Sequence, residues 1–127
     1  MIQLENISVT FEGLELKYPD IQLAEGDQLL ISGNSGVGKS TLIKVLSAMQ
    51  PFKGSYRFRD IDVAALSEKQ KDEFRAQHIG LALQQSNYIA SLTVLENLML
   101  AQLPSRKQKK TKILELLNKL GLHAKVN

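Results

Sequence analysis

The residues with the clearest chemistry lie in a nine-residue loop that combines three glycines, one lysine and three hydroxyl side chains. Its pattern is Gly-x4-Gly-Lys-Ser, which is typical of loops that hold phosphate groups. Glycine reaches backbone angles that other residues avoid, so successive amide hydrogens can converge on an anion. The sequence predicts that a nucleotide is held by Gly33, Asn34, Ser35, Gly36, Val37, Gly38, Lys39, Ser40 and Thr41.

Two side chains of this loop have separate expected roles. Lys39 would place a positive charge beside the outer phosphates, and the Ser40 hydroxyl would contact a magnesium ion that also binds phosphate oxygens. A helix that begins near Lys39 would add the positive end of its dipole. The predicted ligands are therefore ATP and Mg2+. A glycine-rich turn without a ligand is the alternative, and it leaves the match of the whole loop unexplained.

The segments on either side of the loop have the patterns that such a site requires. Residues 28–32 contain the continuous apolar run Leu29-Leu30-Ile31, which predicts a buried strand that leads into the loop. Apolar residues at helical spacing predict a helix over residues 41–49. Upstream, alternating apolar residues predict strands within residues 1–23, with a turn at Gly13 and others near residues 19–20 and 25–27.

Further strands and helices are predicted downstream of the loop. Residues 55–59 alternate like a strand, and residues 79–83 form a short apolar strand. Two capping boxes predict helix starts: Ser67 with Gln70 opens a helix to about Gln77, and Thr93 with Glu96 opens one through Ala101. Residues 105–120 form an amphipathic pattern with Ile113, Leu116, Leu117 and Leu120 on one face, and Gly121 is placed to cap its end.

The composition is that of one soluble domain. The chain has 127 residues, 43% of them hydrophobic, and no cysteine, so disulfides and thiolate metal sites are excluded. No apolar run is long enough to span a bilayer, and a cytoplasmic chain is expected. Residues 105–127 hold seven Lys and Arg against one acid. We interpret this as a solvated helix face and expect no nucleic acid, because no aromatic residue lies among the charges.

Three segments resemble the ATP-binding subunits of ABC transporters. The first is the loop itself, Gly-x-Ser-Gly-x-Gly-Lys-Ser-Thr. The second, residues 79–84, is similar to the strand that leads into the family's Q-loop, with Gln84 as its glutamine. The third, residues 92–97, looks like the segment that follows the Q-loop in many bacterial members. Residues 60–80 are similar to the lipoprotein-release and macrolide-export branch.

The resemblance implies roles for individual residues. Gln84 would contact Mg2+ together with Ser40, act in catalysis with Lys39, and report the nucleotide state to a membrane partner. A solvated residue at a strand end is the alternative for Gln84. Phe11 lies roughly where the family has an aromatic residue that stacks on adenine, although Phe11 also fits a plain core position in a strand.

The resemblance also implies partners and a cellular location. The partners would be a transmembrane permease subunit and a second nucleotide-binding subunit, and the chain would lie on the inner face of the cell membrane. Tyr88, Ile89 and Leu92 are apolar residues within a loop, and we expect them to face the membrane partner. Packing of these side chains beneath the loop is the alternative.

Motifs that follow the Q-loop in the family do not occur in this sequence. It has no Leu-Ser-Gly-Gly-Gln signature, no apolar run that ends in Asp-Glu, and no switch histidine, because His78 and His123 are interpreted as surface residues. Hydrolysis needs a group that orients or activates water. The 127-residue chain is therefore expected to bind ATP but to hydrolyse almost none, and we interpret it as a truncated chain.

The predicted fold class is α/β: a P-loop NTPase core with an N-terminal antiparallel β region and the start of a helical subdomain. We expect one truncated nucleotide-binding domain, with residues 1–84 as β region and core and residues 85–127 as the start of the helical part. The leading function is the ATP-binding motor subunit of an ABC transporter, which couples ATP binding and hydrolysis to transport. The alternatives are a soluble ABC-type ATPase without a membrane partner and a non-hydrolysing nucleotide-binding module.

Overall fold

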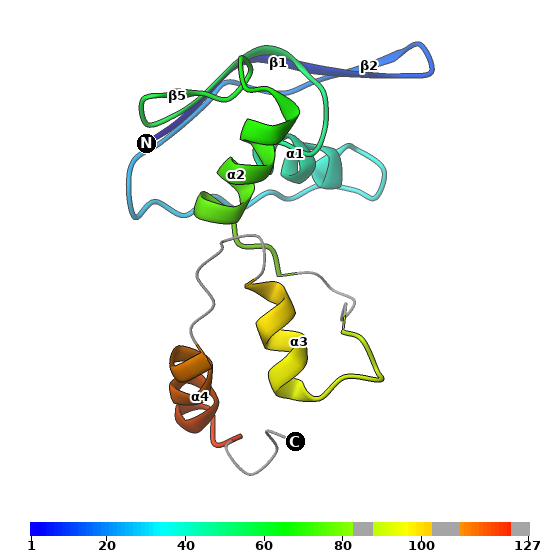
Figure 1. Cartoon of the computed structure of the whole chain (residues 1–127). Coiled ribbons are helices and arrows are strands. Elements are labelled where there is room, and N and C mark those ends of the chain that lie inside the picture. Colours follow the sequence, from blue (N-terminus) through cyan, green and yellow to red (C-terminus); the bar gives the residue numbers. More distant parts are fainter. Residues whose placement is uncertain (83–87, 103–109, 123–127) are drawn as a thin grey trace. The chain divides into compact units, whose positions relative to one another are not determined.

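The computed structural model describes residues 1–82, 88–102 and 110–122 (Figure 1). The chain divides into two compact units, residues 1–71 and residues 72–127. Each unit is described by itself. Among the described residues, no helix combines the length and the apolar character needed to cross a membrane.

The first unit is built on one antiparallel sheet. Its strands are β1 (Ile2–Phe11), β2 (Leu14–Lys17), β3 (Ile21–Leu23), β4 (Lys53–Phe58) and β5 (Ile61–Asp62). β1 is the central strand. On one edge it pairs with β3 and then with β2, and on the other edge it pairs with β4. β5 pairs with β4. The predicted strands at residues 1–23 and 55–59 are confirmed, and so is the turn at Gly13, whose φ is 89°.

A β-bulge in β1 explains a change in its hydrophobic pattern. The buried apolar residues fall on the even position Leu4 and then on the odd positions Ile7 and Val9. Between them the register with β4 shifts, and Asn6 takes a φ of 53°. An extra residue in one strand moves all later side chains to the other face. Gly54 of β4 fits here because a Cβ would lie 2.5 Å from the carbonyl oxygen of Asn6.

The core of the first unit lies between this sheet and α1 (Lys39–Leu46). Leu42 and Val45, three residues apart on one helix face, are both buried. The Tyr56 hydroxyl of β4 donates a hydrogen bond of 2.9 Å to the Leu46 carbonyl at the end of α1. The buried apolar residues of this unit are Leu4, Ile7, Val9, Leu42, Val45, Ala48, Tyr56 and Val63.

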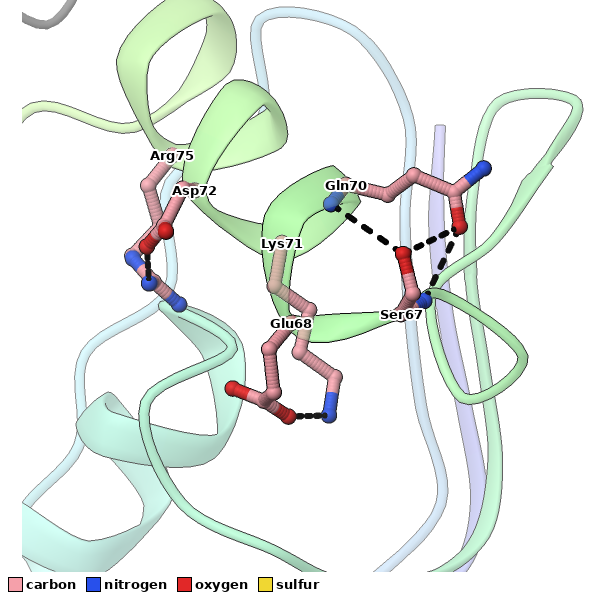
Figure 2. Close-up of polar contacts among 6 residues, drawn as sticks. All are labelled: Ser67, Glu68, Gln70, Lys71, Asp72 and Arg75. Atoms are coloured by element: carbon pink, nitrogen blue, oxygen red, sulfur yellow. Dashed lines mark hydrogen bonds and ion pairs between the residues drawn. The ribbon is translucent and has the colours of Figure 1, made fainter.

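The helix α2 (Glu68–His78) begins at the predicted capping box (Figure 2). The Gln70 side chain accepts from the backbone N–H of Ser67 at 2.9 Å, and the Ser67 hydroxyl accepts from the Gln70 N–H at 3.4 Å. Reciprocal bonds of this kind satisfy donors that a helix start would otherwise leave unpaired. Figure 2 also shows two ion pairs at i,i+3 spacing, Lys71 with Glu68 and Arg75 with Asp72.

In the second unit, α3 (Val94–Ala101) and α4 (Lys110–Lys119) contact each other. α3 begins at the predicted capping box of Thr93 and Glu96. α4 buries Ile113 and Leu117, but Leu116 and Leu120 are 50% and 61% exposed, so the predicted four-residue apolar face is only half covered.

Gly121 ends α4 as predicted. Its φ is 70°, and the Leu122 N–H returns to the Leu117 carbonyl at 2.8 Å, which is the bonding pattern of a left-handed helix cap. The three described lysines of α4 are exposed, as expected for a solvated face.

Three predicted elements differ in the structure. Residues 28–32 form no strand: Leu29 is 43% and Leu30 is 89% exposed. A buried strand needs hydrogen-bonded neighbours, and no described strand pairs with this run. Residues 79–82 likewise form no strand, and Leu83 lies outside the described residues. α1 ends at Leu46 instead of near Met49, because Ala48 takes a left-handed φ of 52°.

Candidate functional site

The phosphate-loop pattern folds into a backbone conformation that requires its glycines. The φ angles of Gly33, Gly36 and Gly38 are 145°, 85° and 98°, a region that side chains disfavour. At Gly38 the limited space also requires glycine, because a Cβ would lie 2.8 Å from the hydroxyl oxygen of Tyr18. At Gly33 a Cβ would lie 3.2 Å from the side chain of Val37. The glycine spacing is thus explained by both angle and contact.

The loop leads directly into the N-terminus of α1. Gly38 is the N-cap residue, no side chain caps this end, and the first turn holds no acidic residue. The first bond of the helix runs from the Leu42 N–H to the Gly38 carbonyl at 3.0 Å. The N–H groups that precede Leu42 therefore have no acceptor within the helix, and the helix dipole makes this end favourable for an anion.

Lys39 lies folded against the loop that it follows. Its Nζ atom donates to the Gly33 carbonyl at 2.8 Å and to the Asn34 carbonyl at 2.6 Å. These two bonds hold a positive charge above the glycine-rich turn. A phosphate oxygen arriving there would compete with the two carbonyls, and as a charged acceptor it makes the stronger bond. Ser40 is exposed and Thr41 is half-buried at the start of the same helix.

The donor set suits ATP with Mg2+. The free amide hydrogens, Lys39 and Ser40 all belong to the start of one helix, and Mg2+ typically keeps waters and phosphate oxygens among its ligands. No group of three His, Cys, Asp or Glu residues suited to a metal occurs within the described parts of the chain.

The other predicted site residues have different outcomes. Phe11 lies at the end of β1, paired in register with Leu14, and its side chain is 42% exposed. It is therefore not a core residue, and its stacking on adenine stays a prediction. Gln84 lies outside the described residues, so its roles toward Mg2+ and catalysis also stay predictions.

Tyr18 contacts the loop and was not singled out from the sequence. Its hydroxyl donates to the Gly38 carbonyl at 3.0 Å across a separation of 20 residues. The alternation of apolar residues indicated only that Tyr18 belongs to a strand region. No local pattern connects a strand residue with a loop so far along the chain, so only the folded arrangement reveals this contact.

A hollow of about 620 Å3 lies beside the loop in the first unit. Its wall includes Lys39, but it is formed largely by residues 17–23 and by the exposed run at residues 29–32. Of residues 33–41, only Val37 and Lys39 line it. The hollow therefore borders the phosphate loop but does not contain most of it.

In the second unit, the loop before α3 presents apolar side chains. Tyr88 is 67% and Ile89 is 50% exposed, while Leu92 is half-buried. The Asn97 side chain holds the loop backbone: its Oδ1 accepts from the Ile89 N–H at 2.7 Å and its Nδ2 donates to the Ile89 carbonyl at 3.1 Å. Because their side chains are exposed, Tyr88 and Ile89 do not pack beneath this loop.

The capping box at the start of α3 carries an ionisable group. Hydrogen bonds from the backbone and the side chain of Thr93 lower the pKa of the Glu96 carboxyl below 4.5. The helix start is therefore best stabilised while Glu96 is ionised.

Comparison with known proteins identifies the family of this site. The family model described as ABC transporter matches residues 16–127, which include the whole phosphate loop. The chain belongs to the ABC transporter family. The predicted resemblance to ATP-binding subunits and the predicted fold class are thereby confirmed.

Several relatives are ATP-binding proteins of transport systems. The chain is 33% identical to the lipoprotein-releasing system ATP-binding protein LolD of Bacteroides fragilis, over 96% of this chain and 59% of that protein. It is 32% identical to the phosphonates import ATP-binding protein PhnC of Lactococcus lactis, over 96% of this chain and 55% of the relative. It is 31% identical to the macrolide export ATP-binding/permease protein MacB of Salmonella choleraesuis, over 100% of this chain and 21% of the relative.

Two solved structures of one ABC cassette have the same fold as this chain. A bacterial ABC transporter cassette in dimeric form matches with a TM-score of 0.82 at 28% identity, and a dimeric post-hydrolysis cassette bound to ADP and Pi matches with a TM-score of 0.80 at 26% identity. Each match covers 100% of this chain and 60% of the solved chain. The chain thus spans about 55–60% of the length of the LolD and PhnC relatives and of the solved chains.

Proposed function

We propose that this chain binds ATP with Mg2+ through residues 33–41 and serves as the nucleotide-binding part of a transporter motor subunit. The observation that carries the proposal is the glycine-rich loop with left-handed φ angles, which leads into an uncapped helix N-terminus. Amide donors and a helix dipole directed at one point are suited to a phosphate group. Lys39 adds the positive charge that a triphosphate requires.

Magnesium would supply charge neutralisation at the outer phosphates when it is bound with the nucleotide. In this chain the Ser40 hydroxyl would contact the ion, and Gln84 is the second proposed contact. Lys39 would leave the carbonyls of Gly33 and Asn34 and bind the phosphate oxygens instead. That exchange keeps the ammonium group hydrogen-bonded both before and after nucleotide binding.

The proposed partners follow from the relatives. Relatives carry names such as lipoprotein-releasing system ATP-binding protein, and one relative is an ATP-binding/permease protein. The matched cassette is dimeric in both of its solved structures. We infer that the protein acts with a permease and with a second nucleotide-binding subunit at the inner face of the cell membrane. Phe11 is proposed to stack on the adenine ring.

The decisive experiment compares Lys39→Ala with Lys44→Ala. Both lysines lie on α1, but only Lys39 contacts the loop. A hydrogen bond to a charged group contributes about 1.5–3 kcal/mol, so Lys39→Ala should weaken ATP–Mg2+ binding roughly ten- to a hundredfold in calorimetry. Lys44→Ala should leave the affinity nearly unchanged. Equal ATP affinity for the wild type and Lys39→Ala would contradict the proposed function.

A further inference from the structure

Tyr18 is held at both ends between the sheet and the phosphate loop. Its backbone N–H donates to the Ile7 carbonyl of β1 at 2.9 Å, which fixes the residue beside the central strand. Its hydroxyl donates to the Gly38 carbonyl at 3.0 Å in a partly buried bond. A half-buried tyrosine just after β2 therefore links the rigid sheet to the residue at which the loop becomes a helix.

The contact is close enough to restrict which residues can occupy the loop. A Cβ at Gly38 would lie 2.8 Å from the Tyr18 hydroxyl oxygen and 3.1 Å from the Leu16 side chain. The Gly38 carbonyl accepts from both Tyr18 and the Leu42 N–H, at 3.0 Å each. A carbonyl oxygen has two lone pairs, so both bonds can form together. The orientation of this one carbonyl is thus defined from two directions.

The orientation of the Gly38 carbonyl also fixes that of the next amide. The peptide bond is planar and trans, so the C=O and the N–H of one peptide unit point in opposite directions. While Tyr18 and Leu42 hold the Gly38 carbonyl, the Lys39 N–H is directed away from them. That N–H is one of the helix-start donors without an intrahelical acceptor.

Tyr18 stabilises the helix start without occupying a donor. Helix N-termini are usually held by a Ser, Thr, Asp or Asn side chain that accepts from an N–H group of the first turn. At α1 such a cap is absent, and a cap would use donors that a phosphate needs. The Tyr18 hydroxyl binds an acceptor instead, so the N–H groups stay available.

We propose that Tyr18 is a positioning residue for the phosphate site: its hydroxyl orients the Gly38–Lys39 peptide so that the Lys39 N–H is preset for a phosphate oxygen. This inference rests on the proposed function, since it concerns the same loop. It adds a strand-region side chain, from outside residues 33–41, to the groups that determine nucleotide affinity.

The chain contains a matched control at the other end of the same helix. The Tyr56 hydroxyl donates to the Leu46 carbonyl at 2.9 Å, at the C-terminal end of α1. Tyr18→Phe and Tyr56→Phe each remove one hydroxyl that donates to a carbonyl at one end of α1, and both keep the aromatic ring. Tyr56 is fully buried, so its substitution should lower thermal stability at least as much as Tyr18→Phe.

The experiment measures binding of ATP–Mg2+ and of pyrophosphate by calorimetry, at a temperature at which circular dichroism shows every variant folded. Tyr18→Phe should weaken both ligands roughly three- to tenfold, because one hydrogen bond that orients the loop is lost. Pyrophosphate has no base, so a loss of pyrophosphate affinity identifies an effect at the phosphate loop. Tyr56→Phe should change either affinity by less than about twofold. The amide resonance of Lys39 in the ligand-free protein should shift in Tyr18→Phe and stay in place in Tyr56→Phe.

The outcomes separate this inference from the proposed function. Suppose that the wild type binds ATP, that Lys39→Ala binds ATP more weakly, and that Tyr18→Phe binds ATP as tightly as the wild type. The positioning role is then wrong and the proposed function stands. Equal losses in Tyr18→Phe and Tyr56→Phe would also overturn the positioning role, because they indicate a general effect of stability. A wild-type chain that binds neither ligand would overturn both.

Discussion

At the residue scale, the site depends on side chains and glycines that each meet a separate physical demand. Gly38 supplies a left-handed φ and the space that Tyr18 occupies. Lys39 supplies a charge that the loop carbonyls hold in place. Any side chain at Gly38 would add backbone strain to a contact shorter than real Cβ atoms show.

Phe11 carries a prediction at this scale. Its exposed ring, at the end of β1, is available for stacking on adenine. An aromatic contact of this kind contributes about 0.5–1.5 kcal/mol, so Phe11→Ala should weaken ATP binding roughly two- to tenfold. Pyrophosphate binding should not change, because that ligand has no base.

Leu14→Ala is the control for Phe11, because Leu14 pairs with Phe11 in the same hairpin and is 64% exposed. It should leave both ligands unaffected. If Phe11→Ala kept full ATP affinity in a folded protein, the stacking role would be withdrawn.

At the scale of elements, both predicted capping boxes define helix starts, at α2 and α3. The box at α3 is sensitive to pH, because hydrogen bonds from Thr93 lower the pKa of Glu96 from 4.5. A carboxyl whose pKa is lowered on folding stabilises the folded state above its unfolded pKa. That contribution is lost as the pH falls below 4.5 and through the folded pKa.

Hydrogen exchange of the α3 amides should therefore accelerate when the pH is lowered through this range, after correction for intrinsic exchange. Glu96→Gln keeps a side chain that can complete a capping box but cannot ionise. It should therefore make the exchange rates of the α3 amides less dependent on pH. Glu115→Gln, in the middle of α4, is the control and should keep the wild-type dependence. Identical profiles for Glu96→Gln and the wild type would show that the carboxyl does not stabilise α3.

At the scale of the whole molecule, the chain shares its fold with ABC cassettes and spans about 60% of their length. The sequence holds no apolar run that ends in Asp-Glu, which could supply a group to activate water. We predict that the purified 127-residue chain binds ATP–Mg2+ yet releases no more phosphate than Lys39→Ala. Robust phosphate release by the wild type, abolished in Lys39→Ala, would refute this prediction.

The exposed loop before α3 is the proposed contact with a membrane partner. In a full-length cassette that contains this sequence, replacing Tyr88 and Ile89 with Ser should reduce co-purification with the permease and leave ATP affinity unchanged. Asn97 holds the loop backbone through bonds to Ile89 main-chain atoms, so the loop should keep its shape. Leu120→Ser changes a residue of comparable exposure just after α4 and should have no effect. Unchanged co-purification of the double variant would exclude this surface.

The sequence by itself determined the features that depend on neighbours along the chain. The phosphate loop, the hairpin turn at Gly13, the two capping boxes and the cap at Gly121 all follow from short-range hydrogen bonds and backbone angles.

Only the tertiary structure decided features that depend on distant partners. The run at residues 28–32 has strand-forming residues but no described strand beside it, so Leu30 is left 89% exposed. The bond from Tyr18 to Gly38 joins residues 20 positions apart, and the sequence pattern assigned Tyr18 only to a strand region. Strand pairing and side-chain contacts across the fold have no signature in local spacing, because their free energy comes from groups that the folded chain brings together.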